Sequence, residues 1–258
     1  MKLKIDVSMN YQLDPSRRVL LTLEAAETEE QVVHRSHLDI DHAWIRRVEG
    51  AGRVGQRSWA HIGIDQMWLG YTAEVEVQRP QVDLASLRPT ALHDLPGEAL
   101  CALRPSRFCQ SDKFTAFVDR RFGGLEGGAK LAAILDWIDE EMIYVPASSD
   151  AETTVMETFV DRQGVCRDYA HMVCALCRAA DIPARYASVY GLGVVPQDFH
   201  AVAQVWLDGA WRLVDATRMC APHQMVLIAV GRDACDVAFM ETEGFASMIT
   251  QQVTVTPL

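Results

Sequence analysis

The chain has 258 residues, about half of them hydrophobic and 23% charged, the composition of an ordinary globular protein with a sizeable core. Its 24 basic and 35 acidic residues give a formal net charge of −11 without a Lys/Arg cluster, which argues against nucleic acid or an anionic membrane as a partner. We expect no signal peptide and no membrane span, and the seven irregularly spaced cysteines favour free thiols in the cytoplasm.

The first 80 residues are predicted to form a β domain. Five segments show partial alternation of apolar and polar residues, with turn sequences between them. Short strands at roughly ten-residue spacing are typical of an antiparallel sandwich. The predicted strands are 2–11, 18–25, 31–40, 56–64 and 68–77.

Residues 81–105 are punctuated by prolines, show no sustained period, and are predicted to be a linker or a packed crossover. Residues 106–258 are then predicted to fold as a second, α+β domain. Its candidate helices are 113–122, 127–142, 149–159 and 166–180, and Ser149 followed by Glu152 is typical of a capping box at the third. Its candidate strands are 184–190, 200–207, 210–217, 224–230 and 247–256.

Cys166 falls at the predicted start of a helix, just after Gly164. Unpaired backbone N–H groups and the positive end of the helix dipole would favour its thiolate, and Gly164 would let a substrate approach closely. A cysteine on an apolar helical stripe is also commonly a core residue. The local sequence therefore leaves both interpretations open.

Three further residues on this helix are predicted to stay out of the chemistry. Cys174 and Cys177 lie ~12 Å and ~16 Å along the axis from Cys166 and are expected to belong to the core. His171 points ~140° around the helix from Cys166, so it cannot serve as its base. We expect it on the surface or on a second face.

A hairpin downstream carries a histidine and an aspartate. Asp208-Gly209 between two alternating runs predicts a two-residue turn that sets Trp206 opposite Trp211. In that register His200 and Asp215 are diagonal neighbours on one face, with Cα atoms ~7–8 Å apart. A one-residue change of loop length would separate them.

Cys166, His200 and Asp215 together predict nucleophilic catalysis. A cysteine nucleophile needs an imidazole to take its proton, and the imidazole needs a carboxylate to fix its tautomer and stabilise its charged form. Each residue alone has an ordinary structural interpretation. Cys166 could be a core residue, His200 a half-buried histidine, and Asp215 an aspartate that ends a strand. The joint pattern favours catalysis.

The segments RQGVCRDYAHMVCALCRAADIPARYASVYG (162–191) and HAVAQVWLDGAWRLVDATR (200–218) resemble the transglutaminase-like cysteine hydrolase superfamily, in its bacterial branch. The resemblance covers residues 108–235. It implies a papain-like α+β core, with Cys166 as nucleophile, His200 as base and acid, and Asp215 as the orienting carboxylate. It agrees with an N-terminal β domain, which bacterial members often carry.

The chain departs from the common family pattern at two positions, with Val202 where tryptophan is frequent and Ala216 where proline is frequent. Neither position supplies a catalytic group. The calcium sites of the animal enzymes have no counterpart, so we expect no metal and no cofactor. The backbone N–H of Cys166 is a natural oxyanion donor. Candidates for the second donor are Gln163 and Tyr144.

Phe199 and Trp206 are candidates for the wall of the pocket, and the glycine-containing loop 191–199 is a candidate gate. The expected function is acyl transfer on an amide through a thioester, with hydrolysis of a protein or peptide substrate favoured. The alternatives are transamidation to an amine, arylamine N-acetyltransferase-like acyl transfer, and an inactive binding module. Self-association stays open.

Overall fold

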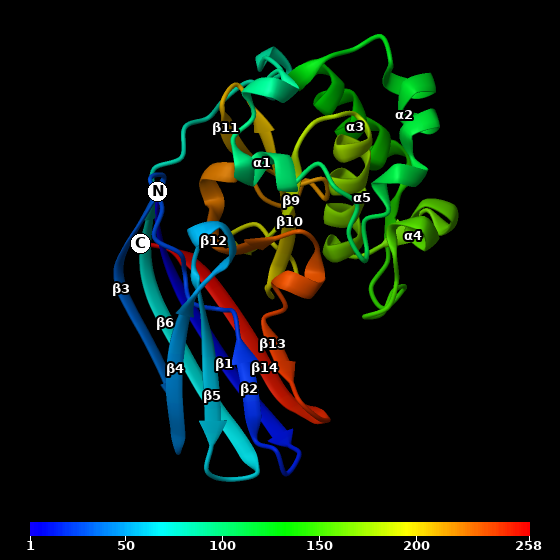
Figure 1. Cartoon of the computed structure of the whole chain (residues 1–258). Helices are drawn as coiled ribbons and strands as arrows, with labels where there is room; N and C mark the ends of the chain where they lie inside the picture. The colour runs from blue at the N-terminus through cyan, green and yellow to red at the C-terminus, as the bar shows by residue number, and fades with distance from the viewer.

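A computed structural model describes residues 1–258. Two four-stranded antiparallel sheets form a sandwich, and each takes one edge strand from the C-terminal end of the chain (Figure 1). The first sheet has the order β14 (Ala246–Pro257), β1 (Lys2–Leu13), β6 (Gln66–Val77) and β3 (Gln31–Ile40). The second has the order β13 (Met240–Thr242), β2 (Arg18–Leu21), β5 (Gln56–Ile62) and β4 (Ala43–Glu49).

The strands of the sandwich follow from the alternation of their side chains. In β1 the inward side chains of Leu3, Ile5, Val7 and Met9 are buried, and they alternate with more exposed polar ones. Strand β4 was not predicted. No residue of β4 is buried, and its apolar and polar side chains do not alternate strongly along the strand.

The prediction that 247–256 completes the α+β domain is wrong. Strand β14 pairs with β1 from Leu3–Pro257 to Leu13–Ala246, and β13 pairs with β2. The alternating buried residues Val253 and Val255 mark a half-buried strand, but alternation does not say which sheet the strand joins.

The α+β half is built on a third antiparallel sheet that is covered by helices. The sheet has the order β11 (Ala210–Val214), β10 (His200–Leu207), β9 (Ala184–Gly191) and β12 (Met225–Gly231). Helix α5 (Cys166–Ala179) packs on β9 and β10, with α3 (Gly127–Glu141), α4 (Val155–Asp161) and α2 (Thr115–Phe122) around it (Figure 1). Apart from six short 3-10 helices, the remaining elements are α1 (Gly97–Cys101) and the two-residue parallel pair β7 (Ile143–Tyr144) and β8 (Gln163–Gly164).

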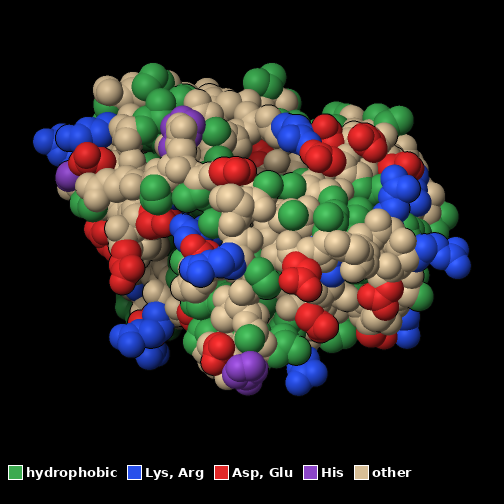
Figure 2. Space-filling model, turned by 90° about the horizontal axis from the view of Figure 1, so that it is seen from above, with side chains coloured by type: hydrophobic (Ala, Val, Ile, Leu, Met, Phe, Trp, Pro, Cys, Tyr) green, Lys and Arg blue, Asp and Glu red, His purple; other side chains and the backbone are tan.

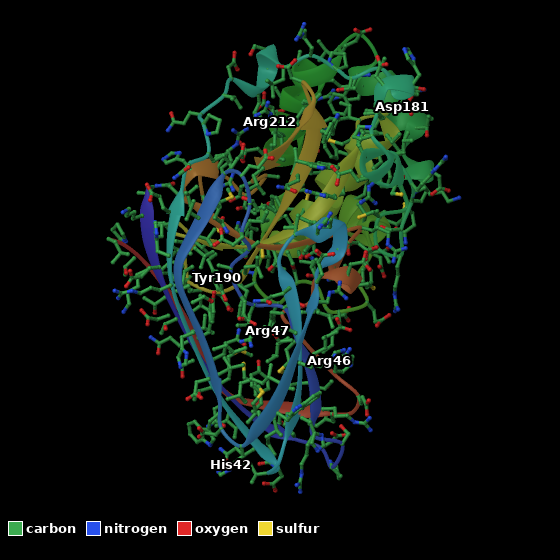
Figure 3. The ribbon with its side chains drawn as sticks, turned by 60° about the vertical axis from the view of Figure 1, so that its left-hand side comes forward. His42, Arg46, Arg47, Asp181, Tyr190 and Arg212 are labelled. Carbon is green, nitrogen blue, oxygen red and sulfur yellow. The ribbon has the colours of Figure 1, made fainter.

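Side chains from each half reach into the other. The buried amide of Gln31 donates to the carbonyl of Leu227 at 3.0 Å and accepts from its N–H at 2.7 Å. Tyr190, labelled in Figure 3 where the sandwich meets the third sheet, donates its hydroxyl to the Leu23 carbonyl at 2.7 Å. One hydrophobic cluster of 54 buried residues runs through both halves. The halves therefore share a core.

On the face shown in Figure 2, acidic and basic side chains are interspersed among apolar and polar surface. None of the helices is both long and apolar enough to cross a membrane.

Candidate active site

Cys166 is the first residue of α5. The residue before it, Val165, has an extended backbone, so the chain turns sharply into the helix at the cysteine. The predicted helix start is confirmed. The thiol is half-buried at the N-terminal end of the helix, where the helix dipole favours negative charge.

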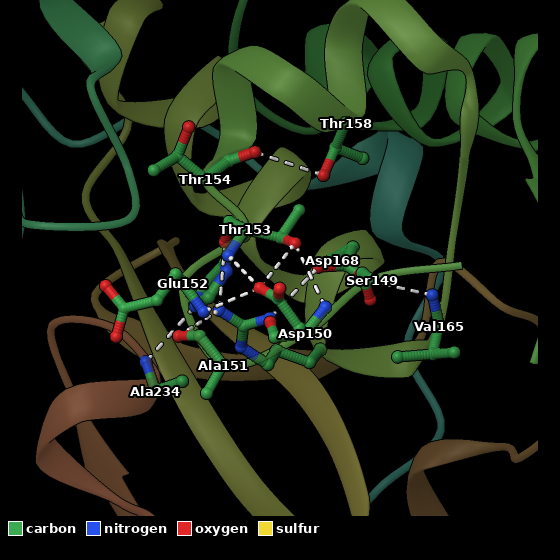
Figure 4. A network of polar contacts seen from close by, with 12 residues as sticks. Ser149, Asp150, Ala151, Glu152, Thr153, Thr154, Thr158, Val165, Asp168 and Ala234 are labelled. Carbon is green, nitrogen blue, oxygen red and sulfur yellow. Dashed lines mark hydrogen bonds and ion pairs between the residues drawn. The ribbon is translucent and has the colours of Figure 1, made fainter. Parts of the chain in front are cut away.

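Asp168 fixes the geometry of this first turn. Its carboxylate is fully buried and accepts from the Val165 N–H at 2.8 Å and from the Ser149 hydroxyl (Figure 4). A Cβ on Gly164 would lie 2.6 Å from the Cβ of Asp168, so only glycine lets the chain pass there. Gly164 is thus required by packing at the helix start.

The prediction of a capping box at Ser149 and Glu152 is wrong. Helix α4 begins at Val155, and its box is made by Thr154 and Glu157, whose carboxylate accepts from the Thr154 N–H at 2.7 Å. Ser149 instead binds Asp168. The two patterns are similar in sequence, and only the tertiary contact decided between them.

Arg167 ties the loop before α4 to the start of α5. Its guanidinium donates to the carbonyls of Asp150, Ala151 and Thr153, the last two at 3.1 Å and 2.9 Å. The loop 149–154 and the first turn of α5 therefore form one polar network (Figure 4). No local pattern in the sequence indicates this role for Arg167.

The predicted hairpin is confirmed. Strands β10 and β11 pair from Ala203–Val214 to Leu207–Ala210, and Asp208 and Gly209 both have positive φ, as a type I′ turn requires. His200 opens β10 and Asp215 follows β11, and the His200 Nε2 lies 3.0 Å from the Asp215 Oδ2. The spacing in the sequence thus brings the two side chains into contact.

Asp215 is held by donors on both oxygens. The Thr217 N–H and hydroxyl donate to Oδ1 at 2.9 Å and 2.6 Å, and the Cys220 N–H donates to Oδ2 at 3.1 Å. Burial raises the pKa of this carboxyl, but the hydrogen bonds and the charge of His200 outweigh burial and lower it. Asp215 is therefore a fixed anion beside the imidazole.

The imidazole of His200 is almost fully buried, and burial alone would lower its pKa. Its hydrogen bonds to Asp215 and Cys166, and their negative charges, more than reverse this and raise its pKa to about 9. Since Nε2 is bound to Asp215, Nδ1 is left to face the sulfur. The ring bridges the thiol and the carboxylate.

The four other residues that the sequence suggests for the site do not all lie at the cleft. The hydroxyl of Tyr144 lies beside Cys166, and burial together with the charge of that thiol raises its pKa to about 12. Gln163 is exposed in the short strand β8. Phe199 lines the cleft beside Cys166 and His200. Trp206 does not line this cleft, because it packs edge-on against Trp211 in a separate pocket.

The cleft that holds Cys166 and His200 has a volume of about 660 Å³. Phe199 and Phe239 form an apolar wall with parallel rings 4.6 Å apart. Glu241 of β13 and Gln251 of β14 also line it, so the sandwich contributes to its rim. The sequence did not reveal Phe239, Glu241 or Gln251, because no local pattern indicates which long-range neighbours a residue has.

Of the two places expected for His171, the surface and a second face of the helix, it occupies the second face, where it is buried. Its Nε2 accepts from the Ala234 N–H at 3.1 Å, and its ring stacks on Phe108 and packs at a tilt against Tyr186. Burial lowers its pKa to about 3, so the ring is neutral. His171 faces away from Cys166 on the second side of α5 and supports the segment around Ala234.

The structure brings together no group of three or more His, Cys, Asp or Glu side chains suited to a metal ion.

Comparison with known proteins identifies the α+β half. The model of the transglutaminase-like superfamily core matches residues 118–216. A Cytophaga hutchinsonii protein, described as a "putative cysteine protease", has a crystal structure that superposes with a TM-score of 0.92. It is 33% identical, and the match covers all of this chain and 91% of that one.

Two more distant similarities were found. An uncharacterised protein of Mycobacterium leprae is 25% identical over 177 residues, which are 65% of this chain and only 62% of that protein's own length. The periplasmic domain of TgpA from Pseudomonas aeruginosa is 19% identical over 85% of this chain and 91% of that one, with a TM-score of 0.42.

Proposed function

Because the chain belongs to the transglutaminase-like superfamily, we propose that it is a cysteine-dependent acyl-transfer enzyme that hydrolyses amide bonds in a protein or peptide. The observation that carries the proposal is the position of His200, whose ring contacts Asp215 at 3.0 Å on one side and lies against Cys166 on the other. Cys166 and His200 line the cleft, and the buried Asp215 contacts the imidazole.

Cys166 is the proposed nucleophile and His200 the acid and base. With a pKa of about 9, His200 is protonated near neutral pH, and this cation favours the thiolate beside it. The sulfur attacks the amide carbon, the S–C bond forms, and the C–N bond breaks as His200 donates its proton to the leaving amine. The neutral imidazole then takes a proton from water, which attacks the thioester and releases a carboxylate and the thiolate.

The developing oxyanion needs two donors. The backbone N–H of Cys166 is one, since at the first residue of α5 it has no carbonyl partner within the helix. The hydroxyl of Tyr144 is the proposed second, because it lies beside Cys166 and its pKa of about 12 keeps it protonated. Gln163 is not proposed for this role, because its side chain is exposed.

The catalytic proposal is tested by thiol reactivity that can be assigned to one residue. Wild type and His200→Ala are alkylated with iodoacetamide between pH 5 and 9, and each cysteine peptide is quantified by mass spectrometry. Near pH 7 we expect Cys166 to be alkylated about 10-fold faster or more in wild type than in His200→Ala. Exposed Cys101 in the same digest is the internal control. Equal rates at Cys166 in both proteins would contradict the proposal.

The reaction is tested with a proteome-derived peptide library. Wild type is expected to produce new peptide ends or to convert glutamine to glutamate, and Cys166→Ala is expected to do neither. An added primary amine that appears in the product would instead indicate transamidation. Release of coenzyme A from acetyl-coenzyme A would indicate the acetyltransferase alternative.

A further inference from the structure

The loop that leads to His200 has little support of its own. Residues 195–198 are exposed and belong to no helix or strand. Downstream, His200 is held by the pairing of β10 with β9. Upstream, the direction from which the chain enters β10 depends on what this loop contacts.

The first contact is a two-point hydrogen bond to β14. The side-chain amide of Gln197 donates to the Val255 carbonyl at 3.0 Å and accepts from the Val255 N–H at 2.9 Å. Strand β14 is the edge of its sheet, so these backbone groups point away from β1 and are free to pair with the loop. The Val255 side chain is buried in the sandwich, which fixes the anchor.

The second contact is a chain of hydrogen bonds that ends next to the histidine. The buried Tyr11 donates to the Gln251 Oε1 at 2.8 Å, and the Gln251 Nε2 donates to the Asp198 Oδ1 at 2.9 Å. The same Asp198 oxygen accepts from the Phe199 N–H at 2.8 Å. A path of direct contacts thus joins the first sheet of the sandwich to the residue before His200.

Phe199 completes the support. Its ring stacks on Phe239, which precedes β13, and packs against Tyr190 of β9 at 5.6 Å. These hydrogen bonds and ring contacts of residues 197–199 come from β14, from the segment before β13 and from the neighbouring strand β9.

From these contacts we infer that Gln197 and Gln251 are positioning residues, through which the C-terminal strand β14 orients the catalytic imidazole of His200. The inference rests on the proposed function of His200. It assigns the sandwich a part in catalysis: β14 fixes the loop, and the loop fixes the ring that must face the sulfur. Neither glutamine touches the reacting atoms.

The test compares Gln197→Ala, Gln251→Ala and the double variant with wild type and with His200→Ala. The first readout is the alkylation rate of Cys166 at pH 7, which needs no known substrate. We expect Gln197→Ala to lower the rate by about 5-fold, toward the His200→Ala value. The fold reduction of the Cys166 alkylation rate in the double variant should be smaller than the product of the two single reductions, since both residues act on one loop.

The second readout is amide hydrogen exchange. Exchange in residues 192–199 should accelerate in Gln197→Ala, while exchange in β9 should stay at the wild-type rate. Gln12→Ala is the matched control, because Gln12 also donates its amide to a distant backbone carbonyl, that of Asp65 at 2.8 Å. It is expected to leave the alkylation rate and the exchange of residues 192–199 unchanged.

The outcomes separate the two proposals. Identical Cys166 reactivity in wild type and His200→Ala overturns the catalytic proposal and the inference with it. A difference between those two proteins, together with wild-type reactivity in Gln197→Ala and in the double variant, overturns the inference alone.

Discussion

At the scale of single residues, the two buried histidines have opposite pKa shifts. Burial lowers the pKa of both His171 and His200. His200 contacts the Asp215 carboxylate and the Cys166 thiol, and these reverse the shift. His171 has Arg167 and Arg178 nearby, whose charges lower its pKa further, against only one opposing carboxylate. The neighbouring charges thus decide which ring is a cation at neutral pH.

The neutral state of His171 predicts sensitivity to acid. Its pKa is about 3 in the folded chain, against ~6.5 when unfolded, so the unfolded state binds more protons between these values. The contribution of neutral His171 to the free energy of unfolding is present above pH ~6.5 and is lost as the pH falls toward 3. By pH 4 the loss is on the order of 3 kcal/mol.

His171→Gln removes this titration while keeping an acceptor for the Ala234 N–H. We expect the variant to be less stable than wild type at pH 7 and the gap to narrow as the pH falls to 4. Urea unfolding at several pH values measures this difference in the free energy of unfolding. A gap that does not change with pH would show that His171 is not kept neutral by the fold.

At the scale of single elements, the first turn of α5 depends on close packing. Glycine at 164 lets the carboxylate of Asp168 reach back to the Val165 N–H, and this bond sets the turn in which Cys166 lies. Because Asp168 is fully buried, the hydrogen bonds that its carboxylate accepts cannot be replaced by water without moving the turn. The helix start is therefore a packed structure as well as a hydrogen-bonded one.

Gly164→Ala is expected to destabilise the protein by about 1–3 kcal/mol, because the new Cβ would lie 2.6 Å from the Asp168 Cβ. Gly70→Ala in β6 is the matched control, since nothing lies within 4 Å of a Cβ at that position. It should leave stability within about 1 kcal/mol of wild type. Urea midpoints compare the variants, and a Gly164→Ala protein as stable as the control would refute the packing argument.

At the scale of the whole molecule, glutamine amides join the halves in both directions. Gln31 of the sandwich binds Leu227 at the edge of the third sheet, and Gln197 of the α+β half binds Val255 at the edge of the first. Each amide supplies one donor and one acceptor to a free strand edge, as a neighbouring strand would. With the shared core of 54 residues, these contacts couple the halves.

The coupling predicts one unfolding transition. Amide exchange measured along a urea titration should show peptides from β1 and β6 losing protection at the same midpoint as peptides from α5 and β9. Fluorescence should give that midpoint too. Two separate midpoints would mean that the sandwich and the α+β half unfold independently.

The local parts of the proposed site could be predicted from the sequence. The turn at Asp208-Gly209 fixes the register that joins His200 to Asp215, and the segment after Gly164 predicts a helix that begins at Cys166. Both features depend on residues close together in the chain, so short-range periodicity and turn chemistry carry them. The α+β class and the sandwich followed in the same way.

The partner of β14, the place of Tyr144 beside Cys166 and the walls of the cleft became known only from the folded chain. It also placed Trp206 outside the cleft. An alternating strand pairs equally well with many edges, and a hydroxyl such as that of Ser149 can cap a helix or bind a buried carboxylate. The choice depends on contacts between residues far apart in the chain, and these leave no periodic signal in the sequence.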